Sequence, residues 1–200
     1  DVRVEESVDA GSFERRLITY ASEPGNRVPA YLLLPKAGAR GAVLCLHPTD
    51  DKIGHKVVVG LGGLPNRQYA SELANRGFIA LAPAYPLLAN YRPDWRKLGY
   101  KSGTMKAIHD NIRGLDLLAS VSGRQSFGAI GHSLGGHNAV YTAVFDQRIF
   151  GVNRAAVSNT VTACRAVGDD RIGQIYGAGI RVNAAAACRR IAARRQTVQR

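Results

Sequence analysis

Short apolar runs alternate with longer segments of helical periodicity over most of the chain. The runs 42–46, 78–82 and 127–130 are apolar without interruption, which is typical of strands buried on both faces of a sheet. Apolar residues instead recur at intervals of three and four residues in other segments, and this spacing predicts helices. These predicted helices cover 66–76, 103–121 and 134–145.

Two further extended segments, 16–20 and 28–34, flank the turn at Pro24-Gly25-Asn26. Pro29 lies inside the second segment and indicates an edge strand. Val152–Ser158 fits a last strand, and the aromatic-rich segment 84–102 has no periodicity and is expected to be a loop. The order of these elements predicts the α/β class, with a mostly parallel sheet flanked by helices.

Length and composition agree with one globular domain. The chain has 200 residues, of which 46% are hydrophobic and 21% charged. No apolar run approaches the roughly 18 to 20 residues that a membrane span requires. Three cysteines without C-x-x-C spacing exclude a disulfide framework and a thiolate zinc site. The chain begins at Asp1 rather than Met, which suggests that its natural start lies upstream and leaves its cellular location undecided.

The net charge of +12 is unevenly distributed. Residues 159–200 contain eight arginines, no lysine and two aspartates, so this last fifth contributes half of the net charge. We therefore divide the chain into a mildly basic domain, 1–158, and an Arg/Ala-rich tail, 159–200.

Gly131-His132-Ser133-Leu134-Gly135 has the pattern G-x-S-x-G. The motif follows the predicted strand 127–130 and begins the predicted helix 134–145. A nucleophile elbow requires this strand–turn–helix context, in which the serine hydroxyl is exposed at the helix N-terminus. The alternative is a glycine-rich turn whose serine only caps the helix.

The turn after strand 42–46 is a candidate for the second half of an oxyanion hole. One donor in such sites is the backbone N–H after the nucleophile, here Leu134. The other comes from the loop after an earlier strand, and Thr49 is the candidate because Pro48 has no N–H. A plain polar turn is the alternative for this segment.

Several stretches of the chain resemble the α/β-hydrolase superfamily, in particular its dienelactone-hydrolase and acetylxylan-esterase-like branch. The resemblance implies a serine hydrolase of carboxylic esters that acts through an acyl-enzyme on Ser133, with Leu134 and Thr49 as oxyanion donors. Dienelactone hydrolases use cysteine as the nucleophile, so the serine favours the esterase side. The matching stretches are 46–49, 66–77, 80–86, 105–113 and 131–138.

The sequence departs from the family pattern after residue 158. In this superfamily the serine is followed by an acid and then by a late histidine. Only His137 follows Ser133, and it lies one helical turn away. His47 is a candidate substitute base, with a structural turn residue as the alternative. Asp169 and Asp170 resemble a strand-end acid but also fit a solvated turn.

The remaining histidines have structural interpretations. His55 fits a polar loop, His109 a helix surface, and His132 is expected to point away from the nucleophile. No metal or organic cofactor is implied, because His132 and His137 are five residues apart rather than the four that align two ligands on a helix face.

The tail suggests that the C-terminal strands, the acid and the histidine of the family have been replaced. Arginine and alanine have GC-rich codons, so a truncated or frameshifted hydrolase is our hypothesis for residues 159–200. Alternatively, residues 183–198 form a basic helix that binds a polyanion. Nucleic acid is the less favoured partner, because the tail has no interleaved aromatic residues.

These observations predict an esterase whose activity is impaired by the missing acid and histidine. The alternatives are a non-catalytic pseudo-hydrolase fragment and a protein that binds a polyanion through its tail. We expect a small-molecule ester as substrate, no membrane span, and self-association through an exposed sheet edge.

Overall fold

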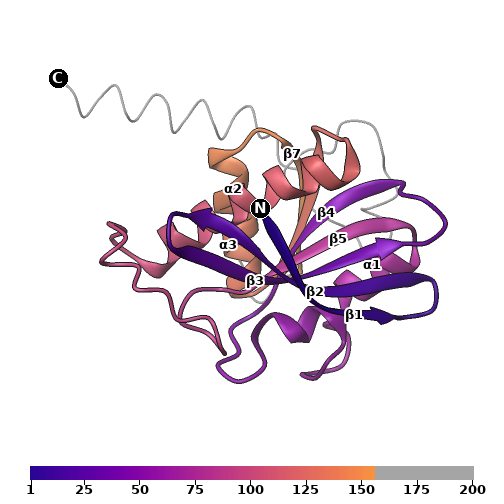
Figure 1. Cartoon of the computed structure of the whole chain (residues 1–200), viewed down its shortest axis with the longest axis horizontal. Coiled ribbons are helices and arrows are strands. Elements are labelled where there is room, and N and C mark those ends of the chain that lie inside the picture. The colour runs from indigo at the N-terminus through magenta and orange to yellow at the C-terminus, as the bar shows by residue number, and fades with distance from the viewer. Residues whose placement is uncertain (156–200) are drawn as a thin grey trace.

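The computed structural model describes residues 1–155, which form a seven-stranded sheet with helices on both faces (Figure 1). The strand order across the sheet is β1-β2-β3-β5-β4-β6-β7. The strands are β1 Val2–Asp9, β2 Phe13–Glu23, β3 Asn26–Pro35, β4 Gly41–Leu46, β5 Phe78–Pro83, β6 Phe127–His132 and β7 Ile149–Ala155.

Most of the described strands run in the same direction. The pairs β4–β5, β4–β6 and β6–β7 are parallel, whereas β1–β2, β2–β3 and β3–β5 are antiparallel. Only β1 and β3 therefore oppose the other five strands of the described sheet. The prediction of a mostly parallel sheet flanked by helices is confirmed for this part of the chain.

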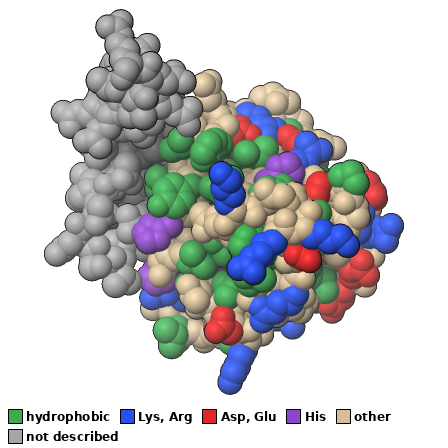
Figure 2. Space-filling view, turned by 90° about the vertical axis from the view of Figure 1, so that its left-hand side faces the viewer, with side chains coloured by type: hydrophobic (Ala, Val, Ile, Leu, Met, Phe, Trp, Pro, Cys, Tyr) green, Lys and Arg blue, Asp and Glu red, His purple; other side chains and the backbone are tan. Residues whose placement is uncertain are grey.

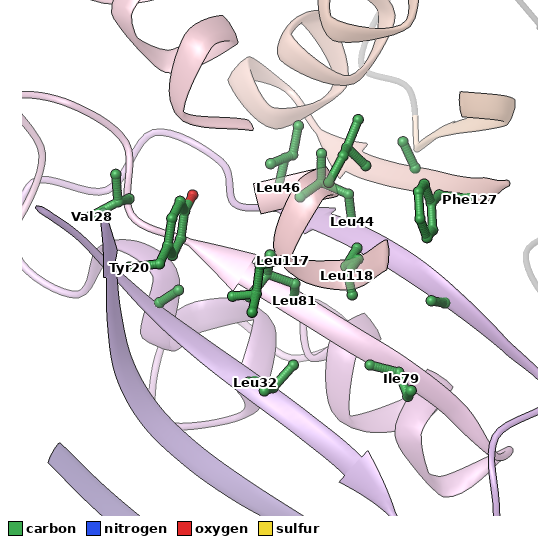
Figure 3. Close-up of a cluster of buried hydrophobic side chains, with 14 of the residues drawn as sticks. Tyr20, Val28, Leu32, Leu44, Leu46, Ile79, Leu81, Leu117, Leu118 and Phe127 are labelled. Carbon is green, nitrogen blue, oxygen red and sulfur yellow. The ribbon is translucent and has the colours of Figure 1, made fainter. Parts of the chain in front are cut away.

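The helices cover both faces of the sheet and complete two separate cores. Helices α2 (Gly103–Ser122) and α3 (Leu134–Phe145) lie on one side, whereas α1 (Tyr69–Asn75) and the 3₁₀ helix η1 (Gly54–Val59) lie on the other. Successive side chains of a strand point to opposite faces of the sheet, which explains the two cores. Leu44 belongs to the core between the sheet and helices α2 and α3 (Figure 3), whereas Val43 and Cys45 belong to the core between the sheet and α1.

The sequence pattern located most of these elements. Helices 103–121 and 134–145 and the three buried strands are confirmed to within two residues at each end. The predicted helix 66–76 is shorter, at Tyr69–Asn75, and the last strand begins at Ile149 rather than Val152. Strand β1 was not predicted, and almost all of its residues are exposed, the alternating Val2 and Val4 included.

The prediction that Pro29 marks an edge strand is wrong. Strand β3 lies between β2 and β5, inside the sheet. Pairing with β5 begins at Ala30, opposite Pro83, and the Pro29 carbonyl then accepts a hydrogen bond from the Ala84 N–H (2.8 Å). The N–H that proline lacks would point toward β5, beyond the last pair of residues, Ala30 and Pro83. Proline is tolerated at position 29 because β5 ends there.

The first half of helix α2 buries a different face from the one that the apolar spacing indicates. Met105 is 48% exposed, whereas Lys106 and Asp110 are fully buried. The apolar residues at helical spacing include Met105, Ile108, Ile112, Leu115 and Leu118, and of these five only Leu115 and Leu118 are buried. The helix therefore inserts a charged pair into the protein before its apolar face begins.

Strands β1 and β7 are the outer strands of the sheet that residues 1–155 form. Self-association through a sheet edge stays a prediction. The tail, 159–200, with Asp169 and Asp170, lies outside the described residues. None of the described helices is long and apolar enough to cross a membrane. On the face shown in Figure 2, basic and acidic side chains are interspersed.

We expect Leu81→Ala to lower the free energy of unfolding by about 3 kcal/mol. Leu81 lies in β5, is fully buried and belongs to the core under α2, so its removal leaves a cavity. Urea unfolding measures the change. Leu64→Ala, at a side chain that is 72% exposed, should change stability by less than about 0.5 kcal/mol. Equal effects of the two substitutions would contradict the assignment of this core.

Candidate active site

The G-x-S-x-G motif forms a sharp turn between strand β6 and helix α3. Ser133 follows the last residue of β6 and has φ 53° and ψ −117°, a backbone conformation that L-residues rarely adopt. Its carbonyl accepts a hydrogen bond from the His137 N–H (3.1 Å), so the helix begins immediately after the serine. The Ser133 side chain is exposed. The sequence prediction of strand, turn and helix around this serine is therefore correct.

Two glycines of the motif are required by close backbone packing. A Cβ atom on Gly131 would lie 2.2 Å from the backbone carbon of Gly135. A Cβ atom on Gly135 would lie 2.0 Å from the carbonyl oxygen of Leu46, at the end of β4. No side chain fits at such distances, so these glycines bring the start of α3 against both strands.

The same packing brings together the turns that follow β4 and β6. The two strands are parallel neighbours, with Leu46 opposite Gly131, so both chains leave the sheet at the same edge. Thr49 lies in the exposed turn after β4, and its N–H makes no hydrogen bond to another described residue. The Leu134 N–H is in the first turn of α3, where backbone amides have no partner inside the helix. Two amide groups are thus available at the edge that carries Ser133.

His47 holds the turn after β4 in place. Its Nδ1 lies 2.7 Å from the Pro48 carbonyl oxygen, and its Nε2 accepts a hydrogen bond from the Tyr85 N–H (3.1 Å). Burial lowers the pKa of His47 to about 4, despite the opposing effect of the Pro48 hydrogen bond. One ring nitrogen is thus engaged within the turn, and the other joins the turn to the loop 84–102. The geometry favours the structural turn residue over the substitute base.

The expectation that His55 lies in a polar loop is wrong. His55 is in η1 and only 2% exposed, with its ring centroid 5.2 Å from that of Tyr31 and 6.4 Å from that of His47. Neither ring nitrogen has a hydrogen-bond partner among the described residues. Burial, helped by His47, lowers the pKa of His55 to about 3. The sequence missed this because the apolar residues of η1 follow the histidine rather than surround it.

The other histidines of the described chain lie on α2 and on either side of Ser133. His109 on α2 lies 3.3 Å from the Ser22 carbonyl oxygen and 3.7 Å from Glu23. His132 is buried next to Ser133, and His137 is exposed on α3 with its ring stacked on Tyr141. Within residues 1–155, no group of three or more His, Cys, Asp or Glu side chains could hold a metal ion.

Comparison with known proteins gives structural neighbours only. No protein-family model and no curated protein matches the chain. Among solved structures, acetyl xylan esterase 1 from Thermoanaerobacterium sp. JW/SL YS485 is similar, with a TM-score of 0.57 and 16% identity over 76% of this chain and 51% of that chain. An acetyl xylan esterase from Paenibacillus sp. R4 has a TM-score of 0.57 and 20% identity over 76% of this chain and 52% of that chain.

A cold-adapted esterase from an Arctic intertidal metagenomic library is also similar, with a TM-score of 0.57 and 23% identity over 75% of this chain and 63% of that chain. The chain thus spans between about half and just under two thirds of the length of these neighbours. All three are esterases, and the fold that they share with this chain confirms the resemblance to α/β-hydrolases of the acetyl xylan esterase type at the level of the fold.

Ser133→Gly should be more stable than Ser133→Ala by about 1 kcal/mol. Both variants lack the hydroxyl group, but only glycine adopts a positive φ without strain. Urea unfolding of the two variants measures the difference. The same pair at exposed Ser126, which has no positive φ, is the control, and there the glycine variant should be the less stable. A less stable glycine variant at both positions would contradict strain at Ser133.

Stability should fall by about 4 kcal/mol between pH 7 and pH 5. The pKa values of His47 and His55 are about 4 and 3 in the folded protein, below the value near 6.5 expected when unfolded. The unfolded state then binds more protons in this window, so stability is complete above about pH 6.5 and is lost as pH falls.

Urea unfolding as a function of pH measures this loss. His55→Gln removes one of the two groups, and the fall between pH 7 and pH 5 should then be about half as large. An unchanged pH dependence in His55→Gln would show that His55 is not a source of it.

Proposed function

We propose that this chain is a serine hydrolase of carboxylic esters that acts through an acyl-enzyme on Ser133. The observation that carries the proposal is the conformation of Ser133, a strained, exposed serine between a buried strand and the N-terminus of α3. Strain of this kind persists only where the surrounding structure imposes it, and it is concentrated at functional sites. The shared fold with several esterases supports this function.

In the proposed reaction, Ser133 Oγ attacks the carbonyl carbon of the ester and passes its proton to a solvent water molecule, which later supplies the proton that the alcohol carries away. The carbonyl oxygen becomes an oxyanion, which the backbone N–H groups of Leu134 and Thr49 stabilise. The C–O bond to the alcohol then breaks, and the alcohol leaves with a proton. Water attacks the acyl-enzyme in the same way, which releases the acid and restores the serine hydroxyl.

We propose that turnover is slow compared with that of a complete triad. The 200-residue chain has no histidine after His137, and both nitrogens of His47 contact backbone groups, those of Pro48 and Tyr85. Without a neighbouring base, serine is a weak nucleophile. The positive end of the α3 dipole and the two amide groups still favour negative charge at this edge. Enzymes that lack triad members retain part of their rate through such groups.

Short acyl groups are the proposed substrates. Two of the neighbours are acetyl xylan esterases, and an acetyl group needs little space beside the serine. The loop 84–102 carries Tyr85, Tyr91, Trp95 and Tyr100 and leaves the sheet at the same edge as Ser133, so we propose that it forms a wall of the ester-binding site.

Hydrolysis of p-nitrophenyl acetate by the purified chain tests the function. The wild-type protein should exceed the buffer rate, and Ser133→Ala should lose at least about tenfold of that excess. Ser126→Ala, at an exposed serine on the approach to β6, should retain full activity. Mass spectrometry of the wild-type protein with substrate should also detect one acetyl group on Ser133, since the same lack of a base slows its removal. Equal, near-background rates in all three proteins would favour the non-catalytic alternative.

A further inference from the structure

A buried charged cluster lies where helix α2 meets strand β2 and the loop 84–102. Lys106 and Asp110, one helical turn apart on α2, form an ion pair in which both side chains are buried. Lys106 Nζ also lies 3.2 Å from Glu23 Oε2 and donates a hydrogen bond to Ser22 Oγ (3.2 Å). The Ser22 hydroxyl in turn donates to Asp110. The proposed chemistry at Ser133 uses none of these groups.

One side of the cluster is made by the aromatic loop. Tyr91, which is buried, donates its hydroxyl hydrogen to Asp110 Oδ2 (2.9 Å), and the same hydroxyl accepts a hydrogen bond from Asn26 Nδ2 (3.0 Å). Lys106 Nζ lies 5.9 Å from the centre of the Tyr91 ring and 5.6 Å from that of Tyr100. Oδ2 of Asp110 therefore binds the loop, whereas Oδ1 contacts both Lys106 and Ser22.

The loop needs external support to keep its conformation. Leu87 has φ 71° and Ala89 has φ 48°, both in the left-handed region that disfavours residues with a Cβ atom. A tight turn joins them to Tyr91, whose carbonyl accepts a hydrogen bond from the Leu87 N–H (2.9 Å). Fixing Tyr91 against α2 therefore also fixes the strained segment before it.

The other end of this segment is joined to the turn after β4. The Tyr85 N–H donates to His47 Nε2, and the Ala89 N–H donates to the Asp51 carbonyl (3.1 Å). The carbonyl of Leu46, just before this turn, is in van der Waals range of Gly135 in the elbow. A continuous set of contacts thus connects Asp110, the aromatic loop, the turn that carries Thr49 and the segment that carries Ser133.

We infer that Asp110, through Tyr91, is a positioning residue that fixes the loop 84–102 as a wall of the ester-binding site. Asp110 acts on the loop and does not touch the reacting atoms, so loss of the contact weakens ester binding and leaves the chemical step unchanged. The role in substrate binding rests on the proposed function, whereas the fixing of the loop does not.

Tyr91→Phe tests the inference because it removes one hydroxyl and leaves the ion pair of Lys106 and Asp110 intact. Tyr20→Phe is the matched control. The Tyr20 hydroxyl is also buried and donates to Asp110, but to its backbone carbonyl (2.9 Å), and Tyr20 lies in β2 rather than in the loop. Both variants lose a buried hydrogen bond to the same residue, but only Tyr91→Phe releases the loop.

Two measurements compare the variants. Trypsin should cut after Arg96, Lys97 or Lys101, exposed residues of the loop or its C-terminal end, about fivefold faster in Tyr91→Phe than in Tyr20→Phe, as expected for the loss of one hydrogen bond. The KM for p-nitrophenyl butyrate should rise about fivefold in Tyr91→Phe with kcat changed less than about twofold, and should stay near the wild-type value in Tyr20→Phe.

Equal cleavage rates in the two variants would overturn the fixing of the loop. Faster cleavage in Tyr91→Phe with an unchanged KM would overturn its role in substrate binding. If the wild-type protein shows no turnover that depends on Ser133, the proposed function is wrong and the role in substrate binding falls with it. The cleavage rates would still decide whether Asp110 fixes the loop.

Discussion

The structure depends on one backbone contact, between the start of helix α3 and the end of strand β4. Gly135 lies so close to the Leu46 carbonyl that a Cβ atom would come within 2.0 Å of it, and Gly131 faces Gly135 just as closely. This contact sets the direction in which the chain leaves β6. Ser133 must then complete the turn in a single residue, which explains its positive φ. The exposure of its side chain is therefore a consequence of strand and helix packing.

Two buried polar side chains extend this constraint to the loops around the serine. His47 joins the turn after β4 to Tyr85, and Asp110 joins helix α2 to Tyr91. Burying these two polar side chains is not an efficient way to gain stability. Burial lowers the pKa of His47 and raises the pKa of Asp110, although the ion pair with Lys106 opposes the second shift. Their geometric effect is specific, because each fixes an irregular segment that apolar packing alone would leave in several arrangements.

The sequence predicts the elements well where one face is apolar and poorly where polar groups are buried. The runs at β4, β5 and β6 are sufficient, because these strands contribute mainly apolar side chains to the two cores. The spacing in α3 also predicts the helix, although Asn138 and Thr142 are buried there as well. Lys106 and Asp110 are the exception, because they are charged and yet buried. The only indication in the sequence is the four-residue interval between their opposite charges.

Other features depend on distant segments and cannot be predicted from local sequence. The position of Pro29 inside the sheet depends on where β5 ends, and the burial of His55 depends on Tyr31 from β3. At the candidate site, the motif was sufficient to predict the turn at Ser133. The contact between Gly135 and Leu46 could not be predicted from the motif, because it depends on β4 and β6 being neighbours in the sheet.

The position of the candidate catalytic groups along the chain follows from this architecture. The serine and the two candidate amide donors are positioned by β4, β6 and α3, all within residues 1–155. Their geometry therefore does not depend on a histidine or an acid from elsewhere. A base supplies proton transfer, whereas preorganised amides and the helix dipole stabilise developing charge, and the two contributions are physically separate. In the proposed reaction, the electrostatic contribution of the amides is therefore independent of the base, because the packing that stabilises the sheet also positions these amides.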